Sequence, residues 1–210
     1  MTEEIVEPSL GLRMRKKLET RHAIRRAALQ LALDDGLENL TIEAIASAAN
    51  ISQRTFFNYF DRKEDALVTN ADEAAAALRP LIVARPAHES PLHAIRVVIT
   101  ENDPFQLLNA DRDQALARQT LIQAHPALMA RQMARFALME QAFASAVAER
   151  LGVDPDSDLR PALTAGVAAA ALRVAIRHWT FDSTTDLPDL LIASFDALEN
   201  GLLAAEVDSG

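Results

Sequence analysis

Gln53 and Arg54 are adjacent polar side chains whose chemistry suits base recognition. A Gln amide can form two hydrogen bonds with adenine in the major groove, and an Arg guanidinium can do the same with guanine. Both follow Ser52, a residue type that caps helix N-termini, so they stand at the start of a short helix. Side chains at this end of a helix reach base edges when the helix lies in the major groove. The pair therefore predicts direct reading of a DNA sequence.

Residues 41–63 predict the elements that position this pair. Thr41 is a good N-cap for a first short helix, and Asn50 tolerates the left-handed conformation in which such a helix ends. The second helix then places Phe56 and Phe60 on one side, four residues apart, and we assign both to the core. Two short helices joined by a tight turn form a helix-turn-helix, whose second helix enters the DNA major groove.

Further residues of this stretch are assigned to the phosphate backbone, which positions a protein without specifying sequence. Thr55, Tyr59 and Lys63 carry donors for such contacts, although a partly buried packing role for Tyr59 is nearly as well supported. Thr41 offers a backbone N–H at a helix N-terminus. Phe57 is expected to press on a thymine methyl group or on the sugar-phosphate backbone.

Charge is unevenly distributed along the chain. The net charge of −9 argues against nucleic acid only if it is read globally. Residues 13–63 hold ten Lys and Arg against six Asp and Glu, whereas residues 64–210 hold eleven against twenty-one. The basic start of the first helix includes Arg15, Lys16 and Lys17, together with Arg21, Arg25 and Arg26. We assign it to the DNA backbone rather than to a solvated helix face, because it adjoins the helix-turn-helix.

Composition favours an all-α fold, since half of the residues are hydrophobic, Ala and Leu dominate, and Gly and Tyr are scarce. There is no Cys, which excludes disulfides and thiolate metal sites. No apolar run approaches the ~20 residues of a membrane span, and the start lacks the apolar core of a signal peptide. We expect a cytoplasmic protein without membrane association.

Catalytic and metal-binding signatures are missing from the sequence. The five His are scattered, and isolated His residues are far more often surface or core residues than ligands. There is no phosphate-binding loop, dinucleotide fingerprint, G-x-S-x-G motif or Cys nucleophile. We therefore expect no catalytic residue, no metal site and no cofactor, and we expect that the protein is not an enzyme.

The sequence divides into four parts. We expect a disordered tail over 1–12, the helix-turn-helix domain over 13–62, a connecting helix over 63–79 and a C-terminal body over 80–210. Pro80 and Pro86 are expected to end the connecting helix and to make 80–90 a linker. The body is predicted to be a helical bundle with helices over 92–100, around 105–108, and over 113–123, 127–151, 159–179 and 187–205.

The stretch from Ile24 to Leu67 resembles the DNA-binding domain of TetR-family transcriptional repressors. The residues that carry the resemblance are Ile24, Ala27, Ala28, Leu31, Gly36, Thr41, Ile45, Ala46, Ile51, Ser52, Thr55, Phe57, Phe60, Lys63 and Leu67. Asn50 stands where the family usually has Gly, and Phe57 where Tyr is commoner. The resemblance implies a homodimer through the last two helices, for which a small-residue surface is offered by Gly166, Val167, Ala169, Ala170 and Ala171. The alternative for that surface is an intramolecular core.

The resemblance also implies an effector pocket in the body. The candidates are Phe105, Leu108, Leu121, Met129, Met133, Phe136 and Phe143, and for any single one an ordinary core position is better supported. The segments LRPALTAGVAAAALRVAIRHW and ARQTLIQAHPALMAR resemble the C-terminal domain of mycofactocin-system regulators within this family. That subgroup is associated with acyl-coenzyme A effectors, which makes a long-chain acyl thioester our first candidate.

We therefore expect a ligand-responsive transcriptional regulator, most simply a repressor, that binds a palindromic operator as a dimer and is released by a small apolar or acyl-type effector. The alternative is a helical-bundle protein or enzyme that binds a small molecule and has no role in DNA binding. The basic charge of residues 13–63 and the polar outer face of residues 53–58 favour the regulator.

Overall fold

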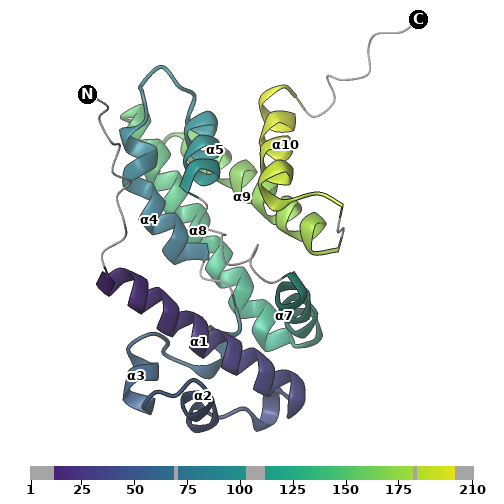
Figure 1. Cartoon of the computed structure of the whole chain (residues 1–210). Helices are drawn as coiled ribbons and strands as arrows, with labels where there is room; N and C mark the ends of the chain where they lie inside the picture. Colours follow the sequence, from purple (N-terminus) through teal and green to yellow (C-terminus); the bar gives the residue numbers. More distant parts are fainter. Residues whose placement is uncertain (1–11, 69–70, 103–111, 182–183, 202–210) are drawn as a thin grey trace, which may run out of the picture. The chain divides into compact units, whose positions relative to one another are not determined.

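The computed structural model describes residues 12–68, 71–102, 112–181 and 184–201, and it divides the chain into two compact units (Figure 1). We call residues 1–68 the N-terminal unit and residues 69–210 the C-terminal unit. Helices and no strand occur in the described ranges, so the predicted all-α class is confirmed.

The N-terminal unit contains short helices packed on one longer helix. Its elements are α1 (Leu12–Asp34), a 3₁₀ turn η1 (Leu37–Asn39), α2 (Ile42–Ala48), α3 (Gln53–Phe57) and a second 3₁₀ turn η2 (Lys63–Ala66). Figure 1 shows α1, in purple, with α2 and α3 on one side of it. The core is made by Ile24, Ala28, Leu29, Ala32, Leu37, Leu40, Ile45, Ala46, Phe56, Phe60, Ala66, Leu67 and Val68.

The turn after α1 depends on Gly36. Its φ of 83° and ψ of 154° lie in a region that is essentially restricted to Gly. Gly is the usual residue two positions after the end of a helix, and the positive φ of Gly36 agrees with that role. The extended ψ then directs the chain into η1, which begins at Leu37.

The C-terminal unit is a helical bundle. Its described helices are α4 (Ala71–Ala84), α5 (Pro91–Asn102), α7 (Arg112–Ala124), α8 (Pro126–Leu151), α9 (Leu159–Phe181) and α10 (Leu187–Glu199). The long helix α8 packs against both α4 and α9, and α10 packs against α9 and α5 (Figure 1). The predicted ranges for α5, α7, α8 and α9 agree with the structure to within two residues. The short helix expected around 105–108 lies outside the described residues.

The region between the two units differs from the expected continuous helix over 63–79 and linker over 80–90. The 3₁₀ turn η2 ends at Ala66 within the N-terminal unit, and α4 starts at Ala71. Pro80 lies inside α4, which continues to Ala84. Pro removes one hydrogen bond from a helix, but Leu78 and Ile82 on the same helix are buried in the core, which favours continuation.

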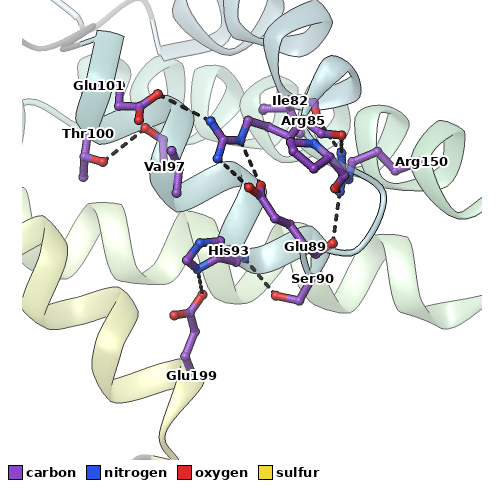
Figure 2. A network of polar contacts seen from close by, with 11 residues as sticks. Ile82, Arg85, Glu89, Ser90, His93, Val97, Thr100, Glu101, Arg150 and Glu199 are labelled. Carbon is purple, nitrogen blue, oxygen red and sulfur yellow. Dashed lines mark hydrogen bonds and ion pairs between the residues drawn. The ribbon is translucent and has the colours of Figure 1, made fainter.

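The turn after α4 is fixed by a side chain from α8. The Arg150 guanidinium donates to four backbone carbonyl oxygens, at 3.0 Å for Ile82, 2.7 Å for Arg85, 2.9 Å for Pro86 and 3.0 Å for Glu89 (Figure 2). Carbonyls at the end of a helix lack intrahelical donors, and Arg150 supplies them. Residues 80–84 are thus helical and the turn that follows them is hydrogen-bonded to α8, which differs from the linker expected over 80–90.

A second polar cluster joins α5 to α10 beside this turn. His93 Nδ1 lies 3.2 Å from Glu199 Oε1 (Figure 2). Arg96 contacts both Glu199 and Asp196. Within the turn, hydrogen bonding to the Arg85 guanidinium lowers the pKa of Glu89 from its usual value of 4.5. The contacts of His93 and Arg96 tie α5 to the end of α10.

The helix α9 is the most apolar long helix of the described residues. By length and composition alone it could cross a membrane. One side of it nevertheless belongs to the core of the C-terminal unit, where it packs between α8 and α10. The side chains on that side are Ala165, Ala168, Ala169, Ala171, Leu172, Ala175 and Trp179.

Candidate nucleic-acid interface

Each helix of the predicted helix-turn-helix begins at a hydroxyl cap. The Thr41 hydroxyl accepts a hydrogen bond from the Ala44 N–H at 3.1 Å, and the Ser52 hydroxyl accepts one from the Thr55 N–H at 3.0 Å. Such caps satisfy N–H groups that have no partner in the helix, and losing one costs about 1 kcal/mol. Asn50, between the helices, has a φ of 53°. The predicted left-handed turn residue is therefore present, although it is not Gly.

Aromatic packing holds α3 against the rest of the unit. Phe56 and Phe60 are buried, as the sequence predicts, and their ring centroids lie 5.7 Å apart. Full burial of a Phe side chain contributes roughly 1.5–3 kcal/mol relative to exposure. Phe57 lies edge-on to Phe56 and is 52% exposed. One side of the short helix is thus anchored, and its other side is accessible.

Two Arg residues of α1 complete this anchor. The Arg21 and Arg25 guanidinium carbons lie 5.3 Å and 5.9 Å from the centroid of the Phe60 ring. Arg21 also donates to the backbone carbonyl of Tyr59 at 3.3 Å. The sequence assigns the basic residues of the first helix to DNA as a group, whereas these two also join α1 to the chain after α3.

The residues assigned to base reading lie together on the outer side of α3. Gln53 and Arg54 are exposed, as is Phe57. Gln53 has one partner that the sequence does not predict, because its Nε2 donates to Glu43 Oε1 of α2 at 3.1 Å. The spacing of ten residues across a turn gives no local sequence signal for this pair.

The residues assigned to phosphate contact are more varied. Thr41 is exposed, while Thr55 and Tyr59 are half-buried, and the Thr55 hydroxyl lies 2.8 Å from that of Ser52. The Lys63 ammonium donates to the carbonyl oxygens of Leu40 at 2.7 Å and Leu37 at 3.4 Å. Its first role is therefore within the unit. On α1, which also contains Arg15, the side chains of Lys16 and Lys17 are exposed.

The candidate pocket residues do not share one environment. Leu121 and Phe143 are buried, and Met129 and Phe136 are half-buried. Met133 is 48% exposed. Phe105 and Leu108 lie outside the described residues. The buried face of α8 runs through Leu128, Gln132, Met139, Phe143, Ala146 and Val147.

The small-residue surface of α9 also differs from its expected role. Ala169 and Ala171 are buried in the core of the C-terminal unit, so this part of the surface is intramolecular. Val167 is exposed. The apolar side chains that α9 leaves exposed are larger, and they are Leu159, Leu163, Val167, Val174 and Phe181.

A capped helix-turn-helix with an exposed polar face, followed in the chain by a separate helical unit, defines a DNA-binding regulator. Residues 24–68 match the family described as bacterial regulatory proteins of the tetR family, and residues 89–203 match the MftR C-terminal domain. The chain belongs to the TetR family of transcriptional regulators. The resemblance drawn from the sequence, including that of the C-terminal segments, is confirmed, and so is the expectation that the protein is a regulator and not an enzyme.

The relatives that this chain matches align with nearly all of it. The transcriptional regulator TcmR of Streptomyces glaucescens is 36% identical over 194 residues, which cover 90% of this chain and 86% of TcmR. MftR of Mycobacterium tuberculosis, described as a regulator of mycofactocin biosynthesis, is 27% identical over 188 residues, covering 90% of this chain and 93% of MftR. The structure of the repressor FadR of Thermus thermophilus, in complex with lauroyl-CoA, has a TM-score of 0.52 to this chain at 23% sequence identity. The match covers 90% of this chain and 98% of the FadR chain. That likeness shows the fold.

Proposed function

We propose that this protein is a ligand-responsive repressor that acts in the cytoplasm and binds a palindromic operator as a homodimer. The observation that carries the proposal is the outer side of α3, where Gln53, Arg54 and Phe57 are exposed while Phe56 and Phe60 anchor the opposite side. Side chains held this way on a rigid, capped helix are suited to the major groove.

A dimer is supported by the exposed apolar side chains of α9. Leu163, Val167, Val174 and Phe181 are spaced by four, seven and seven residues, so they fall on one face of the helix. Ile192 of α10 is another large exposed apolar residue. Contiguous exposed apolar surface of this kind marks association sites. A two-fold dimer presents two reading helices, which matches a palindromic operator.

The effector that we propose is apolar or acyl-type, with a long-chain acyl-CoA as the first candidate. The support is the match of residues 89–203 to the MftR C-terminal domain, together with the lauroyl-CoA bound by the similarly folded FadR. The pocket candidates among the described residues are Leu121, Met129, Met133, Phe136 and Phe143. An effector releases DNA only through a difference in its affinity for the DNA-bound and free conformations.

The alternative is a small-molecule-binding bundle whose basic N-terminal unit has no role at DNA. The family assignment weighs against it. The exposed side chains of α3 weigh against it as well. Gln53 and Arg54 lie beside the exposed ring of Phe57, and DNA bound in this place would contact all three.

A mobility-shift titration on DNA from around the gene tests the proposal. We expect a specific shift that weakens with salt, and lauroyl-CoA is expected to abolish it where free coenzyme A does not. Lack of any specific, salt-sensitive shift would favour the small-molecule alternative. A shift that is unaffected by acyl-CoA chains of several lengths would remove the acyl-type effector and leave the DNA-binding role intact.

Arg54→Ala tests the role of α3, and Arg160→Ala is the matched control. Both changes remove one exposed Arg, but Arg160 lies in the C-terminal unit and pairs with Asp158. Only Arg54→Ala is expected to reduce operator binding. Equal effects would indicate non-specific charge attraction instead of sequence reading.

A further inference from the structure

The hydrogen bond between Gln53 and Glu43 has a defined polarity. A carboxylate only accepts hydrogen bonds, so the Gln53 amide must turn its NH₂ group toward Glu43, as it does at 3.1 Å. The carbonyl oxygen of a planar amide lies at the opposite end of the group. Glu43 therefore selects one of the two amide orientations that Gln53 would otherwise exchange between.

This orientation changes what Gln53 can offer to a base. Its Oε1 is free to accept from an exocyclic amine, which in the major groove is N6 of adenine or N4 of cytosine. Its Nε2 has a second hydrogen, which suits N7 of adenine. Guanine N7 and O6 and thymine O4 are all acceptors, so Oε1 held in this orientation would find no donor on those bases in the major groove. A Gln without Glu43 could turn to meet either kind of base.

We propose that Glu43 is a specificity-determining residue of this regulator, which acts by orienting Gln53 toward a base that presents an amine in the major groove, adenine first. The inference rests on the proposed operator binding and goes beyond it. Both side chains are exposed in the free protein, where water weakens their hydrogen bond. A DNA groove would exclude that water and strengthen the bond.

The negative charge of Glu43 should weaken binding to DNA in general. The carboxylate lies in the first turn of α2, next to a reading helix, and it repels phosphate groups. Its charge also stabilises the N-terminus of α2, so a variant that deletes the charge would change two properties at once. The test therefore keeps the charge and breaks only the hydrogen bond.

The experiment compares Glu43→Asp with wild type on operators selected from randomised duplex DNA. Asp retains the negative charge of the first turn but is one methylene shorter, so it does not reach Gln53. Glu38→Asp, in the first turn of η1, is the matched control. We expect Glu43→Asp to lose about two- to tenfold of the discrimination against guanine and thymine at one base of each half-site. Salt dependence should stay unchanged in both variants.

The route through Gln53 is checked in a Gln53→Met background, where thermal unfolding confirms that each variant is folded. There, Glu43→Asp should change the base ranking no further. An unchanged ranking for Glu43→Asp alone would overturn the inference, and so would an equal change in the Gln53→Met background, which would mean that Glu43 reads the base itself. Failure of the wild type to select any operator would instead overturn the proposed function.

Discussion

Lys63 and Leu40 are joined by a hydrogen bond of 2.7 Å, in which the ammonium of η2 donates to the carbonyl oxygen that follows η1. The same ammonium reaches the Leu37 carbonyl at 3.4 Å. A Lys ammonium has three hydrogens, so one remains for a phosphate. Lys63 is thus suited to hold the helix-turn-helix together and to touch DNA at once.

Lys63→Met should therefore weaken both folding and binding. Two half-buried carbonyls lose a charged donor, which is expected to lower the free energy of unfolding by about 1–3 kcal/mol. Binding to all DNA sequences should weaken alike, with a smaller salt slope. Thermal unfolding and salt-dependent titrations measure the two effects. Lys17→Met removes an exposed charge and should affect binding only; equal melting temperatures for the two variants would refute the structural role of Lys63.

Arg54→Ala should weaken operator binding more than binding to random DNA. A bidentate Arg contact with guanine provides about 1–3 kcal/mol of discrimination, and Arg54 is exposed on α3 beside Gln53. We expect relaxed selection at one or two base pairs of each half-site, measured by binding to a set of singly substituted operators. The assignment fails if Arg54→Ala loses the same affinity on operator and random DNA.

The helix-turn-helix could be predicted in detail because its signals are local. Thr41 and Ser52 cap the helices they precede, Asn50 adopts the left-handed turn, and Phe56 and Phe60 bury themselves at helical spacing. Each of these outcomes depends on residues within a few positions. The Glu43–Gln53 bond spans the turn and depends on how α2 and α3 pack, so no spacing rule indicates it.

The C-terminal unit was harder to predict because its helices carry apolar residues on more than one side. Met133 has the helical spacing of a core residue, yet the core of α8 passes through Gln132 and Met139 instead. Pro80 is a strong local stop signal, yet burial of Leu78 and Ile82 and the carbonyl contacts of Arg150 outweigh it. Packing between distant segments decided both cases.

Arg150→Met should destabilise the C-terminal unit. Four carbonyl oxygens at the end of α4 and in the following turn would lose the hydrogen bond from Arg150, and the expected cost is on the order of 2–4 kcal/mol. Arg79→Met is the control, since Arg79 makes an exposed ion pair with Glu149, a type worth about 0–1 kcal/mol. Urea unfolding would measure both variants. Comparable midpoints would show that the Arg150 contacts are not stabilising.

Asp158 should make stability depend on pH in strongly acidic solution. Hydrogen bonds from the Arg160 side chain and backbone lower the pKa of Asp158 from 3.8 to about 2. A lowered folded-state pKa stabilises the protein above the unfolded value and loses that effect as the pH falls through the folded value. Unfolding midpoints of the wild type should thus decline from pH 4 to about 2. Asp158→Asn should decline less over this window, and an identical decline would exclude the linkage.

Val174→Glu should separate the proposed dimer into monomers. Val174 is 60% exposed at the middle of the apolar face of α9, and a buried unpaired carboxylate in a dimer interface is costly. Leu138→Glu on α8 is the control, because Leu138 is also exposed, at 48%, but lies on another helix. Sedimentation over a range of concentrations gives the mass. A Val174→Glu protein that remains dimeric would show that α9 is not the dimer interface.

A monomeric Val174→Glu protein should also bind DNA more weakly. Its affinity for a full palindrome should fall toward its affinity for a half-site, because the two reading helices are no longer linked.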